Sequence, residues 1–275
     1  MIMFLAGLLL LVPSSAVPQD EPTLKDQFEK FVEILKTSER DRREGEAIAL
    51  IDEFVTRFKA NAKRRTAIEE LLDFGEGDAR DLKKEAKAIE KEDESLAKVI
   101  WLAIDLRDKE VEANQRLWTA AAYAWGQMGA HGSEYLWAAG FEPKRFRRDF
   151  EFQALCVEQV GVTQDYRQVD QLLDTLDYHN ETVAAAAGKA LQHFGDAPGE
   201  VRKISAERLV KLLESRANAA TNVEDTTSIR IYRIIRPSWM SALTALTGET
   251  FTDPLDWTRW WNKNKKNRAI WADRD

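Results

Sequence analysis

The sequence predicts an all-α protein built as an α-solenoid, a stack of antiparallel helix pairs closed by a Trp-rich C-terminal helix. The first observation is composition: only 13 of 275 residues are Gly and 7 are Pro, while helix-favouring Ala, Leu, Glu, Lys and Arg abound. The second is that apolar residues recur at helical spacing almost without a break from Leu24 to Leu213. The third is that three segments in the middle of the chain end in the same pattern.

The region 24–112 reads as amphipathic helices, and its sequence leaves open whether they form degenerate repeats. Residues 27–36 and 45–58 each place apolar side chains at i, i+3, i+4 and i+7, which buries one helix face. The two glycines of residues 73–78 break the pattern, and a long charged helix follows. Leucine or isoleucine recurs there every seven residues, which permits a short coiled coil but is more typical of a solvated helix lying on its neighbours.

The repeated pattern lies in residues 122–129, 154–161 and 188–195. The segments end at Gly129, Gly161 and Gly195, with a small residue seven positions earlier and apolar residues four and one positions earlier. Apolar residues three apart mark a buried face, and the small residue lets a neighbouring helix come close. The final glycine can take the left-handed conformation that ends a helix. Each unit is then a helix pair that must stack on another pair to bury its apolar face.

Residues 169–195, VDQLLDTLDYHNETVAAAAGKALQHFG, resemble a HEAT repeat, with a Leu-Leu pair, a polar turn and an Ala-rich second helix. The likeness to the HEAT-repeat family places repeats at 113–215; residues 130–150, with extra aromatics and a proline, depart most from it. The pattern LTG…F…DP…W…WW of residues 246–261 resembles the tails of exported bacterial HEAT-repeat proteins. The resemblance implies a protein-binding or scaffolding surface with no catalytic centre.

The C-terminal region divides into a polar linker or loop, 216–228, and a helical cap, 229–275, whose first part should be helical on both sides of Pro237 and end at Gly248. Asp253 and Pro254 suit the start of the last helix, which carries Trp257, Trp260 and Trp261 on one face. Three indole rings bury roughly 150–250 Å² each. We therefore expect these residues, with Trp239, to close the open end of the stack; the alternative is a ligand or partner pocket, because Trp is a preferred binding residue.

The N-terminus resembles a signal peptide. Residues 2–12 are an apolar run of 11, too short for a membrane span of ~20 residues. Ser14, Ser15 and Ala16 supply the small residues of a cleavage site after Ala16, which leaves residues 17–23 as a short extension. We expect a secreted or periplasmic protein that is not an integral membrane protein.

No arrangement of residues predicts an enzyme, a cofactor or a metal site. His131, His179 and His193 are scattered, the single cysteine, Cys156, sits in an apolar stripe, and nucleotide-binding and hydrolase motifs are lacking. Residues 201–275 hold 14 Lys and Arg against 9 Asp and Glu, a net of +5, so the total of −7 leaves −12 for residues 1–200. That balance argues against a nucleic-acid binder.

The expected activity is therefore binding of another protein by an exported scaffold. Arg116, Trp118 and Tyr123 are candidate contacts on one helix layer. The alternative is a module that binds a glycan or other ligand through the C-terminal aromatics. Basic clusters that could meet a partner or an anionic surface are Lys144, Arg145, Arg147 and Arg148; Arg230, Arg233 and Arg236; and residues 263–268. Ordinary solvated charge is the simpler interpretation of each cluster.

Overall fold

The computed structural model describes residues 23–37, 43–105 and 111–274, and every regular element in these ranges is helical. The predicted signal peptide, 1–16, and most of the 17–23 extension lie outside them. The helices are α1 Leu24–Lys36, α2 Glu44–Asp73, α3 Ala79–Ile104, α4 Val111–Gly126, α5 Ala130–Phe141, α6 Phe150–Val162, α7 Val169–Thr175, α8 Glu181–Gln192, α9 Gly199–Ala219, α10 Thr226–Thr247 and α11 Pro254–Asn264, with short 3-10 turns η2 Lys144–Phe146 and η3 Tyr166–Gln168. The all-α prediction is confirmed.

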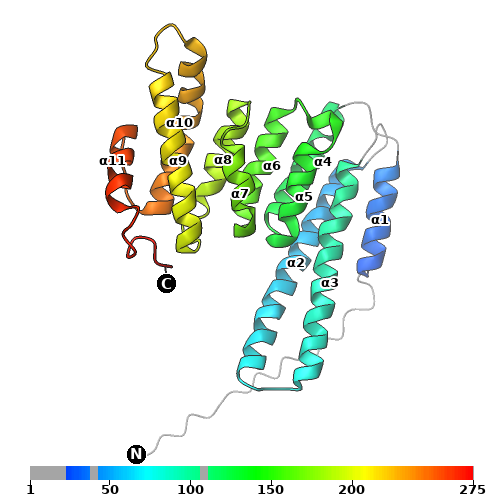
Figure 1. The fold of residues 1–275 in the computed structure, drawn as a ribbon. Helices are drawn as coiled ribbons and strands as arrows, with labels where there is room; N and C mark the ends of the chain where they lie inside the picture. Colours follow the sequence, from blue (N-terminus) through cyan, green and yellow to red (C-terminus); the bar gives the residue numbers. More distant parts are fainter. Residues whose placement is uncertain (1–22, 38–42, 106–110, 275) are drawn as a thin grey trace, which may run out of the picture.

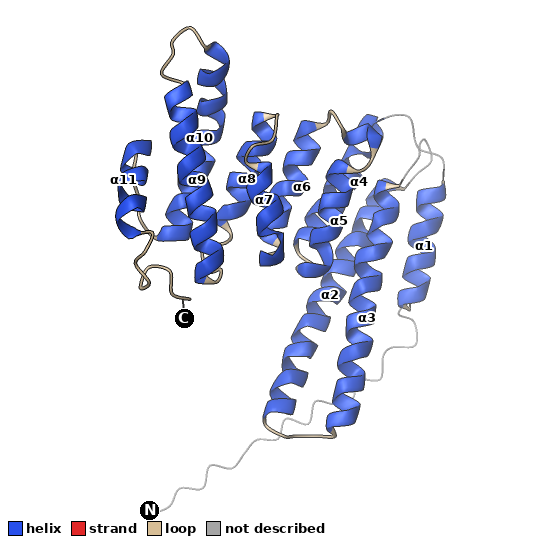
Figure 2. Cartoon of the chain, in the orientation of Figure 1, coloured by secondary structure: helices blue, strands red, loops and turns tan. Residues whose placement is uncertain are grey.

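The helices pack in two rows (Figures 1 and 2). In one row α2, α4, α6, α8 and α10 contact one another in sequence. In the other row α3 contacts α5, and α9 contacts both α7 and α11. Pairs such as α5 with α6 and α9 with α10 join the rows, so the apolar faces meet between them. Within the described ranges, no helix combines the length and apolarity that crossing a membrane requires.

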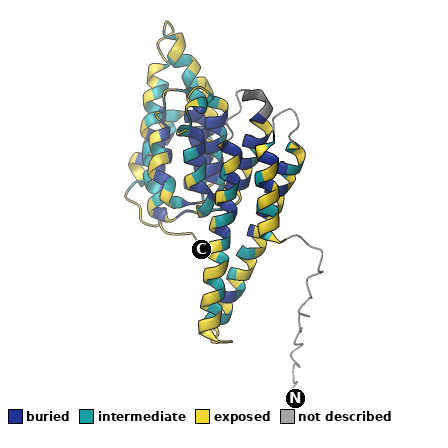
Figure 3. Cartoon of the chain, turned by 90° about the vertical axis from the view of Figure 1, so that its right-hand side faces the viewer, coloured by how far each residue is buried: buried dark blue, intermediate teal, exposed yellow. Residues whose placement is uncertain are grey.

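Helices α2 and α3 form a long hairpin whose far end extends beyond the other helices (Figure 1). Its turn is made by Gly75 and Gly77, whose φ angles of 68° and 80° suit glycine. The buried residues of α2 lie mostly between Ala47 and Phe58, while the distal residues are largely exposed (Figure 3). The solvated-helix interpretation therefore fits the far part of this hairpin.

The expectation that the three repeat glycines take the left-handed conformation that ends a helix is wrong for Gly161 and Gly195. Gly129 has a φ of 55° and precedes α5. Gly161 lies inside α6, where an added Cβ would come within 2.4 Å of Ala190 Cα on α8. Gly195 keeps a negative φ and lies against the backbone of Ala245. At these two positions glycine is needed because a neighbouring segment packs so closely that no room is left for a side chain.

The predicted linker 216–228 is also too long. Helix α9 continues to Ala219 and α10 begins at Thr226, so the connection is only 220–225. The Asp225 side chain accepts a hydrogen bond from the Ser228 amide and caps α10. Pro237 lies on an exposed face within α10, and Gly248 ends that helix with a φ of 83°, as the sequence suggests.

Candidate functional site

The tryptophans of the C-terminal region are mostly buried. Trp257 and Trp261 are buried and Trp260 is half-buried, on α11 where it packs against α9. The Trp257 ring meets Phe251 edge-on at 4.8 Å between centroids. Trp239 is buried between α10 and α8, and its indole N–H donates to the Ala184 carbonyl at 3.0 Å. These side chains thus offer little surface to a ligand.

The basic residues of 144–148 divide into an anchor and an exposed set. Arg145 is half-buried, with its guanidinium 5.5 Å from the Trp118 ring and 5.4 Å from the Phe146 ring. It also donates to the Ile104 carbonyl. Lys144, Arg147 and Arg148 are exposed. Arg145 is therefore not an exposed anion-binding residue, because its contacts hold the η2 turn against α4.

The arginines of α10 do not form one surface either. Arg230 forms an ion pair with Glu181 of α8, and Arg236 donates to the Thr252 carbonyl at 2.8 Å. Arg233 is exposed. Two of the three are therefore engaged in holding neighbouring segments together.

The candidate contacts on α4 differ in exposure. Trp118 is buried and donates to the Ala103 carbonyl at 3.1 Å, so its assignment as an exposed contact is wrong. The helical face that carries it points into the core. Tyr123 is 49% exposed and the Arg116 side chain 78% exposed, so both remain available at the surface.

A polar cavity of about 350 Å³ lies between α3, α5 and the η3 turn, and we call it the acidic cavity. Its lining is Glu90, Glu94, Ala97, Ala130, His131, Glu134, Tyr135 and Arg167. Within the described part of the chain, Glu94 and Glu134 are exposed and make no ion pair. The Glu90 carboxylate lies 3.4 Å from the imidazole Nε2 of His131. Carboxylates thus dominate the cavity.

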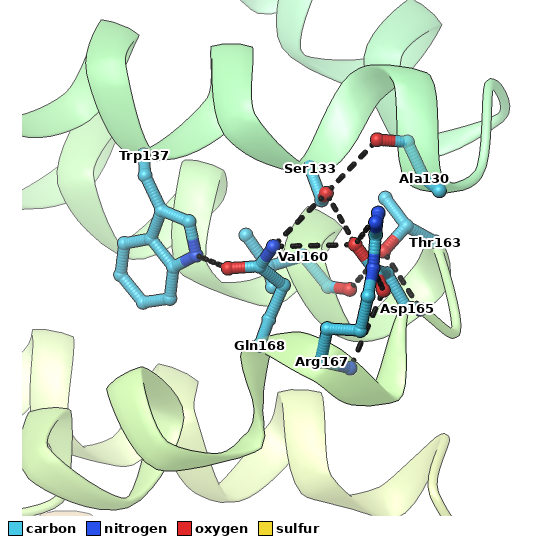
Figure 4. Close-up of polar contacts among 8 residues, drawn as sticks. All are labelled: Ala130, Ser133, Trp137, Val160, Thr163, Asp165, Arg167 and Gln168. Atoms are coloured by element: carbon cyan, nitrogen blue, oxygen red, sulfur yellow. Dashed lines mark hydrogen bonds and ion pairs between the residues drawn. The ribbon is translucent and has the colours of Figure 1, made fainter.

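Arg167, which lines the acidic cavity, is neutralised by a buried carboxylate (Figure 4). Asp165 accepts from Arg167 Nε at 2.7 Å and Nη2 at 2.9 Å, and from the Ser133 hydroxyl at 2.7 Å. Gln168 donates to it at 3.2 Å and accepts from the Trp137 indole N–H at 3.1 Å. Burial raises the pKa of Asp165, but the hydrogen bonds from Arg167, Ser133 and Gln168 outweigh it and lower the pKa to about 2. Asp165 is therefore charged at neutral pH and fixes Arg167.

The wall formed by Tyr135 is rigid. Its ring stacks on Trp125 with centroids 5.5 Å apart and an interplanar angle of 11°. Burial and the nearby Glu134 and Glu94 carboxylates raise the pKa of the Tyr135 phenol, which keeps it neutral. The Trp125 indole donates to the Ala97 carbonyl of α3 at 2.9 Å. The cavity thus has an acidic rim on a packed aromatic base.

Glu90, Asp93 and His131 bring ligand-type atoms within 4.8 Å of one another. Arg65 however forms an ion pair with Asp93 and lies 3.7 Å from the Glu90 carboxylate. Asn61 also donates to Asp93 at 2.8 Å. One guanidinium therefore already lies beside both carboxylates, and a metal ion would meet its repulsion.

Sequence reasoning missed the acidic cavity because its residues come from distant parts of the chain. One signal was present: Glu90 and Glu94 lie one helical turn apart, a like-charge spacing that helices otherwise disfavour. The buried thiol of Cys156 is as expected, and burial raises its pKa.

Comparison with protein-family models, with curated proteins and with solved structures returned no match to this chain.

Proposed function

We propose that the chain is an exported, non-catalytic scaffold, an α-solenoid of the HEAT-repeat type that binds another protein. The two rows of successively packed helices support the solenoid, because each helix pair buries its apolar face against the next. The repeated pattern of residues 122–129, 154–161 and 188–195 supports the HEAT type. The signal-peptide pattern of residues 1–16 supports a secreted or periplasmic location.

The C-terminal helix would close one end of this stack. Helix α11 packs on α9, and the buried Trp257 and Trp261 rings lie on its inner face. An open solenoid end exposes its last apolar groove, and terminal units of such proteins usually cover it. This role requires the tryptophans to be buried, whereas a ligand platform requires exposed rings.

The acidic cavity is the surface that we assign to the partner, and its unpaired carboxylates carry the proposal. Glu94 and Glu134 form no ion pair with any residue in the described ranges, and Asp165 already neutralises Arg167. A cation entering the cavity therefore gains Coulomb attraction without displacing an internal salt bridge from these two residues. A Lys or Arg side chain from the partner fits this environment, and the Tyr135 ring offers an aromatic surface to its alkyl stem or guanidinium.

A peptide selection tests this function. The mature chain from Val17 would be immobilised and exposed to a random display library, and the bound pool sequenced. We expect enrichment of peptides with Lys or Arg beside apolar residues. The matched variants are E94Q/E134Q in the cavity and E142Q/E249Q at exposed carboxylates elsewhere, which carry the same charge change.

The enrichment should disappear with E94Q/E134Q and persist with E142Q/E249Q. An equal loss with both pairs would show non-specific charge attraction and refute the assignment of the cavity. A pool without basic residues would refute it as well.

A further inference from the structure

A second cavity, of about 310 Å³, lies at the C-terminal end of the helix rows and is lined mainly by cations; we call it the basic cavity. It is lined by Glu200, Lys203, Lys265, Lys266, Arg268 and Trp271. The first turn of α9 supplies Glu200 and Lys203, and the other residues follow or end α11. It includes most of the charged segment 263–268 that the proposed protein-binding surface does not use.

The walls of this cavity are fixed by a buried arginine. Arg202 of α9 is 1% exposed and donates to four backbone carbonyls, those of Ala197, Leu246, Ile270 and Ala272. The last two belong to the tail that carries Arg268 and Trp271. Asp273 accepts a hydrogen bond from the Gly199 amide at 2.6 Å. The tail is therefore held against the start of α9, which positions the cations before any ligand arrives.

The cations of the basic cavity are not balanced by acidic residues of the described chain. Four cations face one carboxylate, and none of these five residues forms an ion pair with any residue that the structure describes. Lys203 and Lys265 are half-buried, so they are partly withdrawn from solvent although neither forms an ion pair with a described residue. Residues 1–200 carry −12, which makes a local excess of positive charge notable in this chain. Grouped cations of this kind attract an anion with several charges.

Trp271 gives this cavity a second recognition element. Its ring is half-buried and meets Trp260 and Trp261 edge-on, at 6.1 and 5.7 Å between centroids, and its indole N–H donates to the Asn264 carbonyl at 3.1 Å. The ring is thus immobilised while part of it stays exposed at the cavity wall. A fixed aromatic ring beside cations suits a ligand that has both an apolar ring face and anionic groups.

We propose that the basic cavity binds an anionic sugar, a saccharide that carries two or more phosphate or sulfate groups. Lys203, Lys266 and Arg268 contact the anionic groups, and the sugar ring lies against Trp271. The site is independent of the proposed protein-binding function, because the acidic cavity lies between α3 and α5 at a distance along the stack. It shows how the C-terminal region can recognise a ligand while Trp257 and Trp261 remain buried.

Isothermal titration calorimetry of the mature chain tests the site with two sugars, fructose 1,6-bisphosphate and sucrose octasulfate, which distinguish a phosphorylated from a sulfated ligand. Sucrose, which has no anionic group, is the control for charge. Inorganic pyrophosphate, which has no sugar ring, is the control for the contact with Trp271. We expect at least one anionic sugar to bind more tightly than pyrophosphate, and sucrose not to bind. The variant K203Q/K266Q/R268Q should weaken that sugar at least roughly tenfold, as expected for losing charge-assisted hydrogen bonds.

Two further variants make the test specific. K144Q/R147Q/R148Q removes three exposed cations at residues 144–148 and should leave binding unchanged. K203R/K266R/R268K retains the charges and should retain most of the affinity. The proposal is overturned if neither anionic sugar binds, if pyrophosphate binds as tightly as both sugars, or if the two neutralised variants lose affinity equally.

Discussion

Different forces hold together the α2–α3 hairpin and the block of helices α6 to α11. Across the hairpin, partly exposed ion pairs join the helices, with Arg57 2.5 Å from Glu92 and Arg64 2.6 Å from Glu85. In the α6–α11 block an added Cβ at Gly188 would come 2.4 Å from the Trp239 ring, and the only arginine that is fully buried in the described ranges, Arg202, donates to backbone carbonyls. The block therefore depends on close fit, while the hairpin depends on many weak contacts.

This difference predicts where substitutions are tolerated. Surface ion pairs contribute little because water and salt screen them and two flexible side chains must be ordered. Tightly packed positions respond strongly to small changes in volume. The tightly fitted helices from α6 to α11 should therefore be far more sensitive to mutation than the distal hairpin.

The largest effect is expected for G161A. An added methyl group would lie 2.4 Å from both the Cα and the carbonyl oxygen of Ala190, and backbone atoms cannot move aside without shifting α8. We expect a loss of roughly 3 kcal/mol in the free energy of unfolding, measured by urea denaturation. G45A is the control: nothing lies within 4 Å of its added Cβ in α2, so it should be neutral or slightly stabilising. Equal effects of the two changes would contradict the close-packing account.

Removal of the buried guanidinium by R202M should come next. The change removes the side-chain donor to the carbonyls of Ala197, Ile270 and Ala272, the last two of which lie in the C-terminal tail, and so frees that tail. We expect a loss of about 2–3 kcal/mol, with faster proteolysis of the tail as an independent readout. If the variant has the same urea midpoint as the wild type and its tail resists proteolysis equally well, Arg202 does not hold the C-terminal tail in place.

The Asp165 network should make stability depend on acid pH. Its folded pKa of about 2 lies below the ordinary value of ~3.9, so its contribution is present above pH ~4 and is lost as the pH falls toward 2. The contribution is about 2 kcal/mol. D165N should lower stability at pH 7 and flatten the pH dependence between pH 5 and 2 relative to wild type. Parallel stability curves for the two proteins would disprove this role.

The smallest effect is expected for R64Q on the distal hairpin. Both partners of the Arg64–Glu85 pair are about half exposed. The free energy of unfolding should change by at most about 0.5 kcal/mol, and the difference should shrink further in high salt. A loss comparable to that of G161A would abolish the contrast between the two regions.

The sequence predicted features governed by local chemistry. Helical periodicity identified the helices, Asp253 and Pro254 marked the start of α11, and Gly248 marked the end of α10. The length of the loop 220–225 was overestimated as 216–228, because polar residues also occupy the exposed ends of helices.

Features that depend on contacts between distant segments could not be predicted. Gly161 was expected to adopt the left-handed conformation of a helix cap, because close helix packing and capping both favour glycine and the sequence alone does not distinguish them. The burial of Arg202 had no signal in the sequence, because arginines are rarely buried and its acceptors are carbonyls of distant segments. The acidic cavity joins carboxylates of α3 and α5 that lie about one helix pair apart in sequence.

The most direct test of the account is the affinity of a single Lys- or Arg-containing peptide, taken from the selection, for three proteins. Fluorescence anisotropy would compare the wild type, E94Q/E134Q and E142Q/E249Q at one ionic strength. The account predicts affinity at least roughly tenfold weaker for E94Q/E134Q alone, as expected for losing two charge-assisted contacts. Equal affinity of all three proteins would contradict the assignment of the acidic cavity as the partner-binding site.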